Sequence, residues 1–151
     1  KNGLFDGQNF IYYKNGHIER ISNFINGEKE GRWTYYFSDG QIWYEQNYQY
    51  KIEHGQYIEY YQNGQIKTSG IYKIGKKNGL WISYYGNGQI TEKVNYKNGY
   101  YEGENINYHS NGELKSKGYW INGKKDDLWT WYHQNGQLEE EVSYKDGEIS
   151  W

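Results

Sequence analysis

Histidine and carboxylate side chains are the groups in this sequence that could bind a metal ion or transfer protons. His109 and His133 stand 24 residues apart, at a place where earlier 24-residue steps carry Tyr or Phe. On adjacent hairpins two such residues lie about 9 to 10 Å apart, and no carboxylate or third histidine joins them. We therefore expect the two histidines to be half-buried packing residues, and we predict no metal site.

The acidic run Glu139-Glu140-Glu141 could in principle supply the paired carboxylates of a hydrolase. Alternation along a strand sends Glu140 to the face opposite Glu139 and Glu141, so no convergent pair forms. The sequence contains no phosphate-binding Gly-Lys-Ser/Thr loop, nucleophile elbow or dinucleotide-binding glycine motif. We expect no enzymatic activity, no catalytic residues and no cofactor.

The bulk composition argues against several classes of partner. A net charge of −2 without a basic block gives no electrostatic case for nucleic acid. The pairs Lys76-Lys77 and Lys124-Lys125 form a weakly basic rim that nearby glutamates offset, which argues against membrane contact. With no Cys, the sequence predicts neither disulfides nor a thiolate zinc site, and it does not choose between bacterial cytoplasm and cell envelope.

A 24-residue repeat without insertions must position all of these groups. Residues 1–6 match the end of a preceding repeat, and residues 7–151 form one repeat domain. Its six repeats begin at Gly7, Gly31, Gly55, Gly79, Gly103 and Asp127. A short fixed period indicates stacked supersecondary units in place of a centred globule.

Asn-Gly or Asp-Gly corners divide each repeat into two strands rich in Tyr, Ile, Trp and Thr. The absence of Pro agrees with strands that need every N–H for pairing. The predicted fold is all-β, an elongated single-layer antiparallel meander of hairpins. Lys51 replaces the corner glycine that ends the second repeat, so we expect a different geometry at that corner.

The first corner decides which residues share a face of this sheet. We predict a three-residue loop, Gln62-Asn63-Gly64, which places Tyr60 opposite Ile66. With the first glycine of each repeat as position zero, the columns at positions 3, 5, 11 and 17 would then share one face. The position-2 aromatics Trp33, Tyr57, Trp81 and Trp129 would lie on the other face, exposed.

These columns resemble the MORN repeat variant family, whose unit reads approximately Gly-x-Trp-x-x-Tyr-Tyr-x-Asn-Gly-x-Leu. The repeats at Gly31, Gly55 and Gly79 match it well, and the other three match with some losses. The resemblance implies an open β-sheet without enzymatic activity. Many bacterial members are identified as YwqK-type antitoxins, which would make a protein toxin the partner.

Aromatic side chains on both faces exceed what one buried face needs, so the sequence predicts a binding surface. We expect a non-catalytic protein–protein interaction module, antitoxin-like, immunity-like or scaffolding, that binds a folded partner or a second copy. The alternatives are binding of glycan or choline by the aromatic ladder and a structural spacer or fibre unit. The candidate partner-binding residues are Trp33, Tyr35, Phe37, Tyr57, Tyr61, Trp81, Tyr85, Trp129 and Trp131.

Overall fold

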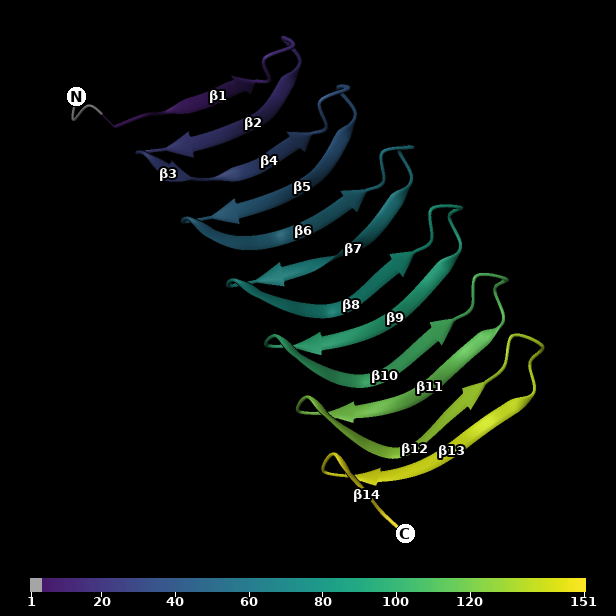
Figure 1. Cartoon of the computed structure of the whole chain (residues 1–151). Helices are drawn as coiled ribbons and strands as arrows, with labels where there is room; N and C mark the ends of the chain where they lie inside the picture. Colours follow the sequence, from purple (N-terminus) through teal and green to yellow (C-terminus); the bar gives the residue numbers. More distant parts are fainter. Residues whose placement is uncertain (1–3) are drawn as a thin grey trace. The chain divides into compact units, whose positions relative to one another are not determined.

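A computed structural model describes residues 4–151 of the chain, which divides into an N-terminal unit, Lys1–Lys76, and a C-terminal unit, Lys77–Trp151. Both units are open antiparallel sheets of hairpins (Figure 1), as the sequence predicts. The described residues contain no helix. Accordingly, no helical segment among them could cross a membrane.

Within each unit the strands pair in chain order, so the predicted meander is confirmed there. Among residues 4–151 the one strand off this path is β3, which pairs with β2. The N-terminal unit contains β1 (Gly7–Tyr12), β2 (Ile18–Ile25), β3 (Glu28–Lys29), β4 (Gly31–Tyr36), β5 (Ile42–Gln49), β6 (Ile52–Tyr60) and β7 (Ile66–Lys73). The strands of the C-terminal part are β8 (Lys76–Tyr84), β9 (Ile90–Lys97), β10 (Tyr100–Tyr108), β11 (Leu114–Ile121), β12 (Lys124–Tyr132), β13 (Leu138–Lys145) and β14 (Glu148–Ile149).

The first corner of each repeat is the predicted three-residue loop. Between β6 and β7, Tyr61 N donates to Gln65 O at 2.8 Å and Gly64 N donates to Tyr61 O at 2.9 Å. Gly64 adopts the left-handed conformation with φ 83°, and Asn63 Oδ1 accepts from Gln65 N at 3.0 Å. Tyr60 therefore lies opposite Ile66, as predicted.

One extra residue just after this corner overturns the predicted grouping of faces. Tyr60 pairs with Ile66, whereas Glu59 pairs with Thr68, so Lys67 forms a β-bulge. A one-residue shift moves every later side chain of β7 to the other face. The position-17 column, Tyr72 in this repeat, therefore shares a face with the position-2 aromatics, and its predicted place beside positions 3, 5 and 11 was wrong.

The second corner at Lys51 has the same geometry as the other second corners. The prediction that its geometry would be different was therefore wrong. Tyr50 and Lys51 have φ 50° and 69°, close to the 51° and 77° of Asn26 and Gly27. Two hydrogen bonds to the preceding repeat hold this turn: Lys51 N donates to Lys29 O at 3.0 Å and Tyr50 N donates to Glu30 Oε2 at 2.9 Å. Tertiary contacts thus impose a left-handed conformation that costs a non-glycine residue about 1 to 2 kcal/mol.

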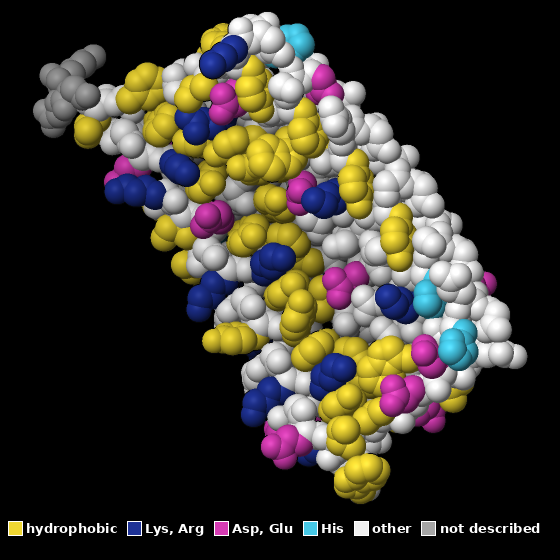
Figure 2. Space-filling view, viewed as in Figure 1, with side chains coloured by type: hydrophobic (Ala, Val, Ile, Leu, Met, Phe, Trp, Pro, Cys, Tyr) yellow, Lys and Arg dark blue, Asp and Glu magenta, His cyan; other side chains and the backbone are white. Residues whose placement is uncertain are grey.

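The most buried apolar side chains lie on one face of each sheet. Trp33, Trp81, Val94 and Trp129 are all almost completely buried. Trp33 lies opposite Gln46, and Trp81 lies opposite Val94, so these residues point to the same side as the position-17 rings. Figure 2 shows hydrophobic side chains gathered along the middle of the strands, with lysines and arginines among them.

Candidate functional site

Rings from positions 2, 4, 13 and 17 form the aromatic face, the most distinctive surface of both units. In the N-terminal unit, Trp33 meets Phe24 at a centroid distance of 5.1 Å and Tyr48 at 5.4 Å, both edge to face. Tyr35 stacks on Tyr44 at 4.2 Å. Such pairs add about 0.5 to 1.5 kcal/mol each beyond the area that they bury. The rings therefore replace the second layer that this sheet lacks.

The aromatic face of the C-terminal unit also consists of packed rings, and it includes Tyr101, which stands two residues before Gly103. Tyr101 lies between Tyr96 and Trp120, with both centroid distances at 4.9 Å. Trp120 meets Trp129 edge to face at 5.1 Å. Trp129 also rests on the backbone of Gly118, because a β-carbon built there would lie 2.0 Å from the indole. The missing side chain of Gly118 is thus what admits the indole.

Three lysines cover these rings. Each stands two residues before the first residue of a repeat. Lys29 Nζ lies 4.5 Å from the Trp33 centroid, Lys77 Nζ lies 4.2 Å from Trp81, and Lys125 Nζ lies 4.4 Å from Trp129. Desolvation lowers the pKa of Lys77 and of Lys125. The lysine ammonium groups thus already lie over the ring faces that a choline group would contact.

The candidate partner-binding residues do not form one accessible surface. Trp33, Trp81 and Trp129 are buried inside the aromatic face, so the expectation that they are exposed was wrong. Tyr57 is half-buried against Tyr72 at 5.9 Å. The position-4 rings Tyr35 and Trp131 lie over the same face beside Trp33 and Trp129, each half-buried.

The remaining three candidates, Phe37, Tyr61 and Tyr85, lie at first corners and are half-buried. Phe37 packs on Trp43 at 5.9 Å, and the backbone N–H of Tyr61 closes its corner. The Tyr85 hydroxyl donates to Tyr108 O at 3.0 Å and so links one hairpin to the next. These side chains therefore contribute to the packing of neighbouring hairpins. Of the nine candidates, three are buried and six are half-buried, and their contact with a partner stays a prediction.

His109 and His133 occupy the same corner column. His109 Nε2 donates to Tyr132 O at 2.7 Å, which reproduces the hydroxyl bond of Tyr85 one repeat earlier. His133 Nδ1 lies 3.9 Å from Glu139 Oε2. The described residues contain no cluster of three or more His, Cys, Asp or Glu side chains that could hold a metal ion. Hairpin linkage and partial burial account for His109, as expected, whereas His133 is exposed, so the expectation that it is half-buried was wrong.

The tyrosines of the N-terminal aromatic face predict a loss of stability at alkaline pH. Burial raises the pKa of Tyr48 to about 12, and it also raises the pKa values of Tyr44, Tyr57 and Tyr72. The unfolded chain releases these protons near pH 10, before the folded chain does, so the free energy of unfolding falls above about pH 10. Urea denaturation measured across this range checks the prediction.

Tyrosinate absorbance gives a second readout of this prediction. Because burial raises the pKa values of Tyr44, Tyr48, Tyr57 and Tyr72, these four side chains should ionise only together with unfolding. A single titration near pH 10 with unchanged stability would contradict the assigned burial.

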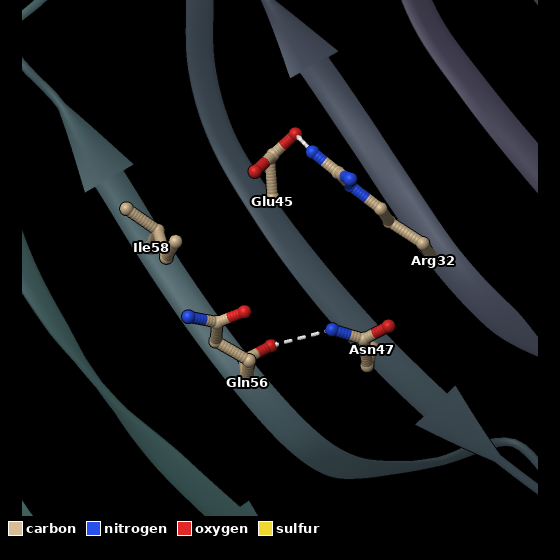
Figure 3. Close-up of a pocket in the computed structure, with 5 residues that line it drawn as sticks. All are labelled: Arg32, Glu45, Asn47, Gln56 and Ile58. Atoms are coloured by element: carbon tan, nitrogen blue, oxygen red, sulfur yellow. Dashed lines mark hydrogen bonds and ion pairs between the residues drawn. The ribbon is translucent and has the colours of Figure 1, made fainter.

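The face opposite the aromatic face carries a polar pocket of about 290 Å³ in the N-terminal unit (Figure 3). Arg32 forms an ion pair with the buried carboxylate of Glu45, and Asn47 Nδ2 donates to Gln56 O at 2.9 Å. Ile58 completes the lining. The buried carboxylate of Glu45 needs a charged partner, which Arg32 provides. The Arg32–Glu45 pair joins β4 to β5, and the Asn47–Gln56 hydrogen bond joins β5 to β6.

Exposed apolar side chains at the second corners of the N-terminal unit were missed by the sequence interpretation. Tyr50 is 74% exposed and Ile74 is 67% exposed, and Ile25 and Ile52 near the same corners are exposed as well. A signal was present in the sequence. The other four corners carry Asn or Asp at this position, namely Asn26, Asn98, Asn122 and Asp146.

A family model described as the MORN repeat variant matches the chain along most of its length. The matched segments are residues 5–26, 29–50, 53–73, 77–98, 101–122 and 128–146. The first five begin at 24-residue intervals, in agreement with the period of the hairpins. No curated protein matches this chain.

Proposed function

Since this chain belongs to the MORN repeat variant family, whose members commonly act as binding or scaffolding modules, we propose that it is a non-catalytic protein-binding module. Its partner is a folded protein, of the toxin kind that an antitoxin or immunity protein neutralises, or a second copy of the chain. The contact surface that we assign lies at the second corners of the N-terminal unit, beside the ends of β2, β5 and β7.

Strained backbone at Tyr50 and Ile74 is the observation that carries this proposal. Their φ angles are 50° and 51°, in the left-handed region that Asn tolerates and that bulky or β-branched residues avoid. No burial of these two side chains offsets the backbone strain, because both are largely exposed. Residues with a strained backbone are found most often at functional sites. This holds above all where the strained side chain makes no packing contact within the chain itself. Contact with a partner would explain why large apolar groups stand here.

The surroundings of Tyr50 suit contact with a protein. A groove of about 510 Å³ beside it is lined by Ile25, Asn26, Glu28, Glu30 and Tyr50. Lys51 Nζ lies 2.6 Å from Glu28 Oε1, so a charged pair borders the exposed apolar side chains. An apolar centre with a polar rim is typical of protein interfaces.

The two alternatives have weaker support. Choline or glycan binding by the aromatic face would compete with Lys29, Lys77 and Lys125, which already cover the rings. A spacer or fibre unit does not require strained, exposed apolar residues at corners.

We expect the double substitution Tyr50→Asn and Ile74→Asn to raise stability and weaken partner binding at once. Asn fits the left-handed conformation, so relief of strain should raise the free energy of unfolding by up to about 1 kcal/mol per site. Loss of the apolar side chains should reduce the affinity for the partner. The partner is captured from the native cell, purified and titrated against both proteins, and thermal melting is measured in parallel.

Tyr100→Asn is the matched control for this experiment. Tyr100 is also exposed at a second corner, but it belongs to the C-terminal unit and lies outside the left-handed positions. This substitution should leave the affinity for the partner unchanged and should change the melting temperature only slightly. Sedimentation of wild type and double variant tests the second copy as partner. Unchanged affinity in the double variant, despite a raised melting temperature, would remove the corners from the interface.

A further inference from the structure

A groove on the C-terminal unit lies on the face opposite its aromatic face. Its volume is about 420 Å³, and strands β10 to β13 line it. Tyr119, Leu128, Thr130 and Tyr132 supply apolar and hydroxyl contacts, and Tyr119 and Leu128 are 46% and 45% exposed. Charged side chains at its border are Glu104, Lys117, Asp127 and Glu141.

Two residues of this groove break the repeat at some cost to the fold. Asp127 adopts φ 61° at the position where the other five repeats carry Gly. Tyr119 stands where three repeats carry Asn, and in the N-terminal unit such an asparagine bonds across strands, as Asn47 does to Gln56 O. The repeat thus loses a favourable glycine and a cross-strand amide at the same groove. In return the groove gains a carboxylate and a ring.

The charge at the groove is acidic after its internal ion pair is counted. Lys117 Nζ lies 2.9 Å from Glu104 Oε1, which neutralises both groups. Asp127 and Glu141 make no ion pair within the described residues. Two carboxylates therefore border an apolar surface formed by Tyr119 and Leu128. That combination is complementary to a basic side chain next to an aliphatic one.

We propose that this groove binds a segment of a partner protein in which a basic side chain adjoins an aliphatic one. The aliphatic group contacts Tyr119 and Leu128, and the basic group lies between the carboxylates of Asp127 and Glu141. This site goes beyond the proposed corner interface, because it lies on the other unit and uses no residue of that interface.

The probe for this site is N-acetyl-leucyl-arginine amide, titrated into the full chain and followed by NMR at the Tyr119 ring and the Leu128 methyls. We expect the control, N-acetyl-leucyl-glutamate amide, to bind at least about fivefold more weakly, as expected for exposed charge pairs. The difference should shrink as salt rises. Equal binding of both probes, or stronger shifts from methyl glycosides, would overturn the proposal.

Two consensus substitutions test the residues without unfolding the chain. Asp127→Gly and Tyr119→Asn restore what other repeats carry, so the melting temperature should stay equal or rise, and arginine-probe binding should fall by about fivefold or more. Unchanged probe binding in the double variant would overturn the proposal. The Tyr50 and Ile74 variant should bind the probe normally, so failure at the groove and failure at the corners give different results.

Discussion

Replacement of Trp33 by Ala should lower the free energy of unfolding by about 3 to 5 kcal/mol, as for other large buried aromatics. Trp33 is only 2% exposed, and its rings contact Phe24 and Tyr48. Its Nε1 also donates to the half-buried Asn23 O at 2.9 Å, so truncation removes one donor to this carbonyl, which also accepts from Glu30 N at 3.1 Å. Thermal and urea denaturation, followed by near-ultraviolet circular dichroism, measure the loss.

Trp43→Ala is the matched control in the same unit. Trp43 is 42% exposed and lies at the bulge after the first corner, where it contacts Phe37 and Tyr44. The same atoms are removed, but less apolar area returns to water. The loss should be less than half of that for Trp33. Equal losses would contradict the burial difference on which the account of the aromatic face depends.

Gly118→Ala should destabilise the C-terminal unit severely although it adds only one methyl group. The new β-carbon would meet the Trp129 indole at 2.0 Å, and Trp129 is itself buried against Trp120. Either the indole moves out of the aromatic face or β11 separates from β12. Overpacking of this kind costs about 1 to 3 kcal/mol, and a displaced tryptophan adds to it. The melting temperature and the emission of the buried tryptophans report the change.

Gly86→Ala supplies the comparison within the C-terminal unit. No atom lies within 4 Å of a β-carbon built at Gly86, and its backbone lies outside the left-handed region. Alanine there should leave stability unchanged or raise it slightly, because it restricts the unfolded chain. If both glycine substitutions cost the same, the contact between Gly118 and Trp129 would not be the cause.

These expectations separate residues that build the fold from residues that are free to bind. The aromatic face is a core spread over one side of a sheet, with lysines as its cover. The surfaces that we propose for partners are the exposed corners at Tyr50 and Ile74 and the groove at Tyr119 and Leu128. In a repeat protein, the departures from the repeat mark such surfaces, because the shared residues are those that hold neighbouring hairpins together.

The sequence alone determined the 24-residue period, the strands and the geometry of the first corner. These follow from local chemistry, since Asn-Gly at a hairpin corner and alternating aromatic residues act within a few neighbouring residues. The loop Gln62-Asn63-Gly64 and the pairing of Tyr60 with Ile66 were predictable for that reason. The left-handed turn at Tyr50 and Lys51 was not predictable from the sequence, because hydrogen bonds to the preceding repeat hold it.

Only the tertiary structure decided which rings share a face and which are buried. The bulge at Lys67 depends on how β6 and β7 fit together, and its single extra residue moves Tyr72 to the side of Tyr57. The burial of Trp33 likewise depends on rings and a lysine from neighbouring strands. Register and burial are properties of paired strands, so the pattern along one strand predicts the set of aromatic residues but not their exposure.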